Sequence, residues 1–460
     1  MAYKWKVLVS IIFGVFMATL DTTAVNVAFP TLRAEFGATL RQAQWIVSVY
    51  VLALGVTTPA AGFLADRYGI KRVYVTGLAV FVLGSLAAGL APTLGALVAG
   101  RVLQGVGGGL AIPNGTAMLF RGFDKKELGL ALGVFGLALL FAPALGPVVA
   151  GLLIDRGHWR WIFFINVPVG VLGVLLASRL LREQRAERAP AWDAAGLALA
   201  ALGFGATLWA ASVVRERGWG APEVALAFAV GAAALVALAW VELRVARDPL
   251  LDLRLFARPV FLVATLVGWV TVVAFFGAEF LLPVYLQVVR GASAVAAGSA
   301  LVPLALVAGV TLPLAGALYD RVGPRPLVVA GFALLAYNTW SLAHLALDTP
   351  RPTILWLMAL RGLALGLTVQ TPFTAALGVV PADLVPRGTA LITATRYVAQ
   401  ALGVATLATV LAAASGGPGA PPALAGFAQA YTVTFGLAVA ATALGVLLPG
   451  WPRRWAPSGA

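Results

Sequence analysis

Apolar segments of about 20 residues follow one another along almost the whole chain, separated by short stretches with charged residues, prolines or glycines. A helix needs about 20 apolar residues to cross the hydrocarbon core of a bilayer. The pattern therefore predicts an all-α integral membrane protein with fourteen transmembrane helices. Their expected ranges are 7–29, 42–62, 73–91, 95–118, 129–153, 162–181, 193–214, 222–242, 259–286, 294–316, 327–347, 353–377, 388–412 and 427–450.

The basic residues between these segments indicate how the chain is oriented. With the N-terminus on the cytoplasmic side, 21 of the 32 Lys and Arg residues fall in cytoplasmic segments and 8 fall on the opposite side. Cytoplasmic loops carry an excess of positive charge, so we expect a multi-pass protein of the cytoplasmic membrane with both termini in the cytoplasm. Lys4 and Lys6 precede an apolar run that is too long for a signal peptide and has no clear cleavage site before Asp21, which predicts a retained first helix.

Composition supports a membrane protein and narrows the possible chemistry. Of the chain's residues, 61% are hydrophobic and 11% are charged, whereas about a quarter of the residues of a soluble domain are charged. Its formal net charge of +14 fits cytoplasmic loops that face anionic lipid, and we expect no nucleic-acid partner. The sequence holds no cysteine, and its two histidines, His158 and His344, are far apart. We therefore expect neither a metal site nor a cofactor.

Two sequence patterns recur in the same order. PAAGFLADRYGIKRVYVTGL, from Pro59, aligns with PLAGALYDRVGPRPLVVAGF, from Pro313, and LVAGRVLQGVGGGL, from Leu97, aligns with LMALRGLALGLTVQ, from Leu357. The first offset crosses eight predicted helices rather than six, so two helices are inserted between equivalent halves. Parallel six-helix repeats around a central cavity are typical of secondary transporters. The expected domains are a first half at 1–190, two inserted helices at 191–255 and a second half at 256–460.

The stretch GFLADRYGIKR joins the second and third predicted helices. Its glycines permit a tight turn, and its charged residues can latch neighbouring helix ends. The alternative is a solvated positive loop, which explains the basic residues but not the ordered Gly, Asp, Arg and Gly. The predicted cytoplasmic gate consists of Gly62, Asp66, Arg67, Gly69, Lys71 and Arg72, with Asp320 and Arg321 in the second repeat.

The stretch LVAGRVLQGVGGG places an arginine inside the fourth span. An intramembrane arginine costs several kcal/mol unless it faces a cavity or an acid. Arg101 and Gln104 lie three residues apart and share one helix face. The glycines that follow allow a neighbouring helix to approach closely. Such an arginine can pair with an acid and tune its protonation as helices move, and the alternative is a structural arginine that bonds backbone carbonyls.

The stretch GLALLFAPALGPVVAGLLID contains two prolines and three glycines within an apolar span. In a soluble helix an interior proline costs about 3 kcal/mol and a glycine about 1 kcal/mol. Ala142, Gly146 and Ala150 recur every four residues and form one stripe of small residues, which lets helices pack closely in lipid. The pattern predicts a kinked, close-packed hinge, and a merely kinked helix is the alternative. The hinge residues are Pro143, Gly146, Pro147 and Gly151.

Two acids lie within predicted spans. Asp21 ends the first span in LDTTAVNVAFPTL, where desolvation disfavours the charged carboxylate and suits proton exchange. The alternative is a neutral, hydrogen-bonded acid at a helix contact. Glu279 lies in FFGAEFLLPVYLQ, and three roles remain open for it. It carries protons, holds a lipophilic cation among aromatic rings, or pairs with Arg361 or Arg396.

Other polar and aromatic residues inside the spans are candidates for the lining of a central cavity. Each of them alone also suits ordinary helix packing. The candidates are Asn26, Gln44, Trp45, Tyr50, Gln104, Phe276, Glu279, Gln287, Asn338 and Gln370.

Taken in order, the four motifs resemble the major facilitator superfamily, specifically its fourteen-span drug:proton antiporter branch. The resemblance covers nearly the whole chain and implies two six-helix halves with two additional helices inserted between them. It also links Arg101 to proton transfer and the 142–151 motif to exporters. The chain departs from the family pattern at Ile70, where a basic residue is usual, and at Ala142 and Ala150, where glycine is usual.

The resemblance implies a proton-coupled antiporter that exports hydrophobic or cationic drugs by alternating access, driven by the proton gradient. Its expected partners are such compounds, protons and membrane lipids, and one chain suffices for a complete pathway. The alternatives are an exporter of lipids or another amphiphile, and a non-transporting receptor. The ExxER pattern of peptide importers is missing from the first span. No Walker A, dinucleotide or HExxH pattern occurs, so we expect no enzyme.

Overall fold

The computed structural model describes residues 3–124, 127–185, 189–292, 294–414 and 424–450. Within this part of the chain every regular element is a helix, and there is no strand. The side chains of some helical residues, among them 143, 147 and 275–280, lie outside the described residues.

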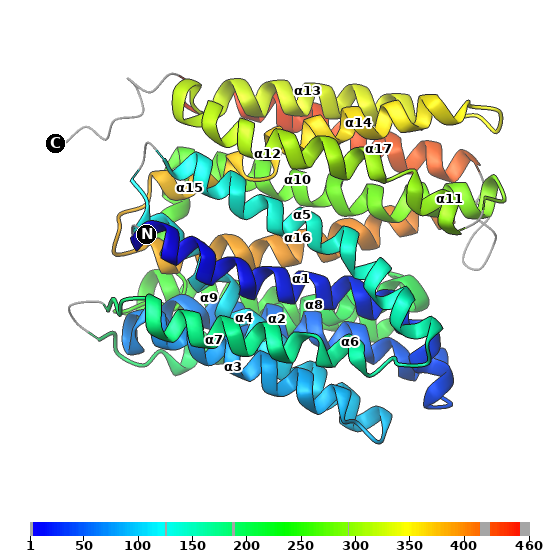
Figure 1. Cartoon of the computed structure of the whole chain (residues 1–460). Coiled ribbons are helices and arrows are strands. Elements are labelled where there is room, and N and C mark those ends of the chain that lie inside the picture. The colour runs from blue at the N-terminus through cyan, green and yellow to red at the C-terminus, as the bar shows by residue number, and fades with distance from the viewer. Residues whose placement is uncertain (1–2, 125–126, 186–188, 293, 415–423, 451–460) are drawn as a thin grey trace.

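The first repeat forms long helices that lie nearly side by side (Figure 1). Glycines set the spacing of α3 and α4, because a Cβ on Gly84 would lie 2.6 Å from the amide nitrogen of Gln104 and one on Gly107 would lie 2.4 Å from that of Phe81. The glycines of the fourth span thus allow the close approach that their pattern predicts. The helices are α1 (Tyr3–Glu35), α2 (Leu40–Tyr68), α3 (Ile70–Gly89), α4 (Leu94–Gly122), α5 (Leu128–Asp155), α6 (Trp161–Phe164) and α7 (Asn166–Leu180).

Two helices follow that pack on each other, α8 (Ala194–Arg217) and α9 (Pro222–Trp240). A π-helical turn η1 (Val241–Val245) and a 3-10 turn η2 (Leu253–Ala257) connect them to the second repeat. Its elements are α10 (Pro259–Val284), η3 (Tyr285–Val289), α11 (Ala294–Ser299), α12 (Val302–Val322), α13 (Pro324–Ala343), α14 (Arg351–Thr368), α15 (Thr371–Gly378), α16 (Val385–Ala413) and α17 (Leu424–Val446).

Each of the ranges expected to span a membrane overlaps one helix or a pair of adjoining helices. Among the described residues, 11 helices are long and apolar enough to cross a bilayer. Large apolar side chains lie on their outer faces, such as Val236 of α9, which is 71% exposed. These features identify a multi-pass membrane protein, whose full count of fourteen spans stays a prediction.

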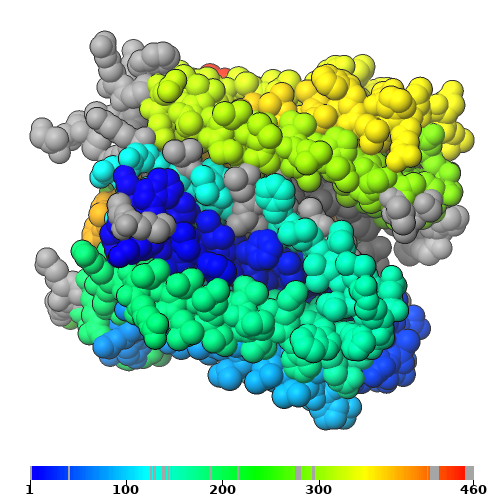
Figure 2. All heavy atoms as spheres, in the orientation of Figure 1, coloured from blue at the N-terminus to red at the C-terminus, as the bar shows by residue number. Residues whose placement is uncertain are grey.

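Helices α5 of the first repeat and α16 of the second provide much of the contact between the repeats. Figure 1 shows α5 and α16 between the lower helices of the first repeat and the upper helices of the second. A Cβ on Gly133 of α5 would lie 2.6 Å from Cα of Pro313 in α12, and α16 packs against α2 and α8. The space-filling view shows α1 and α5 at the surface between the two repeats (Figure 2).

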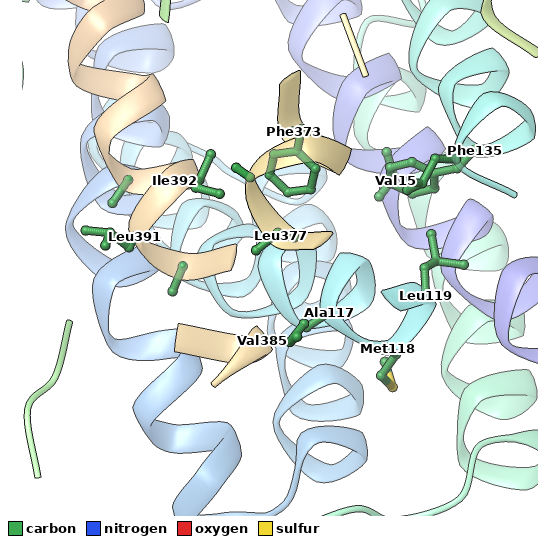
Figure 3. Close-up of a cluster of buried hydrophobic side chains, with 14 of the residues drawn as sticks. Val15, Ala117, Met118, Leu119, Phe135, Phe373, Leu377, Val385, Leu391 and Ile392 are labelled. Carbon is green, nitrogen blue, oxygen red and sulfur yellow. The ribbon is translucent and has the colours of Figure 1, made fainter. Parts of the chain in front are cut away.

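Apolar side chains join the repeats near the start of α16. Phe373 of α15 and Ile392 of α16 belong to the same buried cluster as Met118 of α4 and Phe135 of α5 (Figure 3). The rings of Phe373 and Phe120 meet edge to face with centroids 5.9 Å apart. The repeats are therefore in close contact at this level of the bundle.

Candidate functional site

A buried ion pair between Asp21 of α1 and Arg101 of α4 forms the centre of the first repeat. The side chain of Asp21 is 0% exposed and that of Arg101 is 1% exposed. The pair joins two of the sequence candidates for proton coupling. Because two charges taken out of water are stable only when their geometry is good and their other polar atoms are bonded, the neighbours of this pair decide its state.

Three uncharged polar side chains complete the network. Gln104 donates through Nε2 to Asp21 Oδ1 at 2.9 Å and accepts from Arg101 at 2.8 Å. Asn166 donates through Nδ2 to the same Asp21 oxygen at 2.8 Å. Ser85 accepts from Gln104 at 3.1 Å and from Asn166 at 3.0 Å, and donates to the carbonyl oxygen of Phe163 at 2.9 Å. Each carboxylate oxygen of Asp21 thereby accepts at least one hydrogen bond.

The elements explain how these residues meet. Arg101 and Gln104 share one face of α4, as their spacing predicts. Asn166 is the first residue of α7, where the chain bends after the short helix α6. Ser85 lies on α3, which the glycines hold close to α4. Sequence reasoning missed Ser85 and Asn166, although each is a polar residue in or at the start of an apolar segment.

Helix α2 provides the remaining contacts of Arg101. Its Nε donates to the carbonyl oxygen of Ile46 at 3.0 Å. Its guanidinium carbon lies 4.2 Å from the centre of the Tyr50 ring, a cation-π distance. Arg101 thus pairs with an acid and also bonds a backbone carbonyl, and its role in proton coupling stays a prediction. A change in the charge of Asp21 would act on α1, α2 and α4 together.

A second ion pair joins the two repeats at the end of the bundle where α1 begins. Arg387 of α16 donates through Nε to Asp66 of α2 at 2.7 Å, and through a second nitrogen to the carbonyl of Pro249 at 3.1 Å. A Cβ on Gly62 would lie 2.7 Å from the carbonyl oxygen of Pro386, so α2 and α16 touch through their backbones. We call this contact the latch.

Arg121 strengthens the closure at the same end. From α4 it donates to the carbonyl oxygen of Ala382 at 3.1 Å and to that of Asp383 at 3.2 Å, both between α15 and α16. Four hydrogen bonds thus join Arg387, Ala382 and Asp383 of the second repeat to the first repeat or to the segment before α10. The bundle is closed at this end.

The other residues of the predicted gate bind within their own half or to the segment before α8. Arg67 bonds the carbonyl of Pro190 and stacks on Trp192 with its guanidinium carbon 4.9 Å from the ring centre. Gly69 has a φ of 100°, which favours glycine. Its neighbours Lys71 and Arg72 donate their backbone amides to Glu183 at 3.0 and 3.2 Å. Glu183, which sequence reasoning missed, therefore caps the start of α3.

The latch corrects the expected assignment of charges. Arg72 is one of the predicted gate residues, but its side chain is 68% exposed and its Nε lies 3.8 Å from a carboxylate oxygen of Glu183 in its own half. The partner of Asp66 is Arg387, which the sequence presented only as one of many cytoplasmic charges. Of the second loop, Asp320 is half-buried at the end of α12 and Arg321 is exposed.

Only part of the predicted hinge in α5 packs closely against α1. Ala142 and Ala150 are fully buried, and a Cβ on Gly146 would lie 2.0 Å from the hydroxyl oxygen of Thr23 in α1. By contrast, a Cβ on Gly151 would meet nothing within 4 Å, so Gly151 lies outside the contact. The side chains of Pro143 and Pro147 lie outside the described residues.

The candidate cavity residues separate into several groups. Tyr50 and Gln104 belong to the Asp21 network, and Asn338 accepts from Arg361 at 2.9 Å in the second repeat. Gln370 lines a cavity of about 10 Å³ between α5, α12, α14 and α15, large enough for one water molecule. Asn26, Trp45 and Gln287 are exposed, and Gln44 is half-buried. Phe276 and Glu279 have side chains outside the described residues.

Comparison with known proteins agrees with this architecture. The profile of the Major Facilitator Superfamily matches residues 11–404. Lincomycin resistance protein LmrB of Listeria innocua is 30% identical over 407 residues, which cover 88% of this chain and 86% of the relative. Multidrug resistance protein B homolog of Mycobacterium tuberculosis is 33% identical over 401 residues, which cover 86% of this chain and 74% of the relative.

Solved structures show the same fold at low sequence identity. The proton:xylose symporter XylE bound to 6-bromo-6-deoxy-D-glucose superposes with a TM-score of 0.71 at 15% identity, covering 97% of this chain and 96% of its own. The human organic anion transporter MFSD10 superposes with a TM-score of 0.67 at 17% identity, and the match covers 96% of this chain and 99% of that transporter. The profile match and the relatives show that this chain belongs to the Major Facilitator Superfamily of membrane transporters.

Proposed function

We propose that the protein is a proton-coupled antiporter that exports hydrophobic or cationic compounds across the cytoplasmic membrane by alternating access. The observation that carries this proposal is the buried pair of Asp21 and Arg101, with Gln104 and Asn166 bonded to the same carboxylate. Relatives named as multidrug and lincomycin resistance proteins support export of small molecules.

Protonation of Asp21 supplies the coupling in this proposal. The ionised carboxylate accepts bonds from Arg101, Gln104 and Asn166, which hold α1, α4 and α7 together. A proton on Asp21 removes the charge that compensates Arg101, and an uncompensated buried charge is costly. The helices therefore favour a different arrangement once Asp21 is protonated, and proton binding and helix movement become linked.

The latch defines the second state in the proposal. With Asp66, Arg387 and Arg121 bonded across the repeats, the end that carries the start of α1 is closed. We assign this end to the cytoplasm from the distribution of basic residues. Access alternates when these bonds break and the repeats part at this end. The contact between α1 and α5 at Gly146 changes in the same movement.

Further parts of the proposal follow from the helix order. Fourteen spans comprise two six-helix halves at 1–190 and 256–460, with α8 and α9 inserted, and both termini lie in the cytoplasm. One chain provides the full pathway as a monomer, and the proton gradient drives it without a cofactor. Export of lipids or another amphiphile on the same scaffold is the second candidate function, since the same Asp21 network would serve it. A non-transporting receptor is the third, and the buried proton-coupling network argues against it.

The test is ethidium transport into or out of proteoliposomes under an imposed pH gradient. Wild type is compared with Asp21→Asn, which keeps the shape of the side chain but cannot ionise, and with Asp124→Asn, an exposed acid, as the matched control. We expect gradient-driven transport in wild type and in the control, and loss of the gradient dependence in Asp21→Asn.

Two outcomes would contradict the proposal. Transport that keeps its pH dependence in Asp21→Asn would move the proton site to Glu279. Absence of ethidium transport in correctly folded wild type, together with movement of a fluorescent phospholipid, would establish the lipid exporter instead.

A further inference from the structure

Arg396 lies near the middle of α16, far from either end of the helix. It follows Val385, the first residue of α16, by 11 positions, which is about 16 Å along a helix. The hydrocarbon core of a bilayer is about 30 Å thick, so Arg396 lies close to the midplane. An arginine at that depth is costly unless it faces water, a cavity, an acid or a ligand.

Arg396 borders a small cavity whose walls are apolar apart from Arg396 itself and Thr265 of α10. The cavity is about 10 Å³ in volume, and Gly268 of α10, Pro372 and Phe373 of α15, and Ile392 of α16 line it together with Arg396. The guanidinium carbon lies 5.9 Å from the centre of the Phe373 ring. Because Phe373 also meets Phe120 of α4, the cavity adjoins the seam between the two repeats.

Arg396 also lies close to the proton-coupling network. The next residue, Tyr397, is near enough to Tyr50 of α2 for an electrostatic interaction. Tyr50 is the ring on which Arg101 stacks. Helix α16 therefore borders α2 on the side of the Asp21 and Arg101 pair.

The partners of Arg396 differ from those of the other two arginines within the spans. Arg101 pairs with Asp21, and Arg361 donates to Asn338 and to the carbonyl of Ala274, and both are almost fully buried. Among the residues that the structure describes, no carboxylate or hydrogen-bond acceptor contacts the half-buried Arg396. Its charge is compensated neither by an acid nor by a carbonyl of that part of the chain.

We infer that Arg396 is a substrate-binding residue that receives the carboxylate of an amphiphilic substrate, whose apolar part lies against Phe373 and Ile392. Guanidinium groups bind carboxylates through two parallel hydrogen bonds, and the attraction is stronger away from water. A carboxylate at this position neutralises a charge that the apolar walls leave uncompensated. This inference rests on the proposed export function. The cavity of about 10 Å³ has room for about one water molecule in this closed state, so the substrate enters the seam beside Arg396 once the repeats part.

The experiment uses rhodamine B, which carries a free carboxylate, and its ethyl ester, in which an uncharged ester group with an added ethyl replaces that carboxylate. Binding of both dyes to detergent-solubilised full-length protein is measured by fluorescence anisotropy, and their gradient-driven transport is measured in proteoliposomes. The variants are Arg396→Gln, Arg396→Lys and, as the matched control, Arg254→Gln, an exposed arginine outside the cavity.

We expect wild type and Arg254→Gln to bind rhodamine B more tightly than its ester. Arg396→Gln should weaken binding of rhodamine B about tenfold, the scale of one lost charge-assisted hydrogen bond, and leave the ester within about twofold. Arg396→Lys should restore part of the preference because it keeps the charge but not the paired geometry.

Equal binding of the two dyes in wild type, absence of binding by either, or equal weakening of both in Arg396→Gln would overturn the inference. The binding assay separates this inference from the proposed transport function. Carboxylate-selective binding that depends on Arg396, combined with no gradient-driven transport of either dye, would support the site while contradicting proton-coupled export.

Discussion

The turn between α2 and α3 and the turn between α12 and α13 have similar backbone conformations and similar backbone hydrogen bonds. In the first turn Ile70 donates its amide to the carbonyl of Gln184 at 3.0 Å, and in the second Arg325 donates its amide to the carbonyl of Pro449 at 3.3 Å. In each repeat the acceptor lies in the segment that follows the last helix of that repeat. Each turn is therefore anchored to its own half.

The preceding glycine adopts a positive φ in both turns, 100° at Gly69 and 77° at Gly323. The repeated Gly, Asp, Arg and Gly thus preserve a backbone conformation that L side chains rarely adopt. Their side-chain contacts differ. Asp66 crosses to Arg387 of the other repeat, whereas Arg325 donates to the carbonyl of Leu448 in its own half at 2.6 Å.

The comparison teaches that one sequence order serves two purposes. Both repeats retain the glycine at positive φ and an amide that bonds the segment after their last helix, although the donors Ile70 and Arg325 are one position apart in the aligned repeats. The latch depends in addition on a partner from outside the motif, Arg387, and on the backbone contact at Gly62. Variants at equivalent positions can separate the two purposes.

The largest effect is expected for Gly62→Ala. The added Cβ would lie 2.7 Å from the carbonyl oxygen of Pro386, and backbone atoms cannot swing away as a flexible side chain can. We expect the rate of ethidium transport to fall about tenfold or more, because overpacking of this size opposes closure. Gly95→Ala, where a Cβ meets nothing within 4 Å, is the control and should stay within about twofold. Normal transport by folded Gly62→Ala would show that the latch does not need this approach.

The next effect concerns the ion pair of the latch. Asp66→Asn and Arg387→Gln should each reduce transport about tenfold, because either change leaves a poorly compensated, largely buried charge. The double variant should be no worse than the more damaged single variant, since both remove the same interaction. Strictly additive losses would show that the two residues act independently, and the measurement is the initial rate of ethidium transport for all four proteins.

Stability should distinguish the two positive-φ glycines. Gly69→Ala places a Cβ 2.3 Å from the carboxylate of Glu183, a side chain that can move, so we expect a loss of about 1 kcal/mol. Gly323→Ala places the new Cβ 2.7 Å from the carbonyl oxygen of Gly450. Because this oxygen belongs to the backbone and cannot swing away, we expect the free energy of unfolding to fall by about 2 kcal/mol or more. Thermal unfolding in detergent should therefore give the lower apparent Tm for Gly323→Ala, and the reverse order would contradict the anchor at Pro449 and Gly450.

The smallest effect is expected at the cap of α3. Glu183→Gln should lower stability by about 0.5 to 1 kcal/mol, because a carboxylate at a helix N-terminus is favourable and accepts the free amides of Lys71 and Arg72. Arg72→Gln removes only an exposed ion pair and should change the apparent Tm hardly at all. Equal shifts in the two variants would mean that the ion pair, and not the cap, stabilises the turn.

Much of the fold could be predicted because it depends on local patterns. Apolar length, the distribution of basic residues and the repeat at Pro59 and Pro313 predicted the helical ranges and their order. The types of residue at the candidate site were predicted in the same way, since Asp21 and Arg101 are costly in a span without a partner. The profile match to the Major Facilitator Superfamily confirmed the resemblance.

Other features could not be predicted from local patterns. The sequence did not give the partners of Arg101, which in the structure are Asp21 and the carbonyl of Ile46. It offered Arg72 in the gate, although the partner of Asp66 is Arg387, 321 residues away. It assigned Gly151 to a tight contact that the structure does not contain.

The sequence by itself determined where the helices lie, which residues are too polar for lipid and which turns require glycine, because these depend on a residue and its close neighbours. Only the tertiary structure decided that Asn166 and Ser85 complete the Asp21 network and that Arg387 closes the latch. It also decided that Arg396 faces an apolar cavity instead of an acid among the described residues. Hydrogen bonds and ion pairs require atoms within about 3 Å of each other. Which distant residues come that close is set by the packing of whole helices.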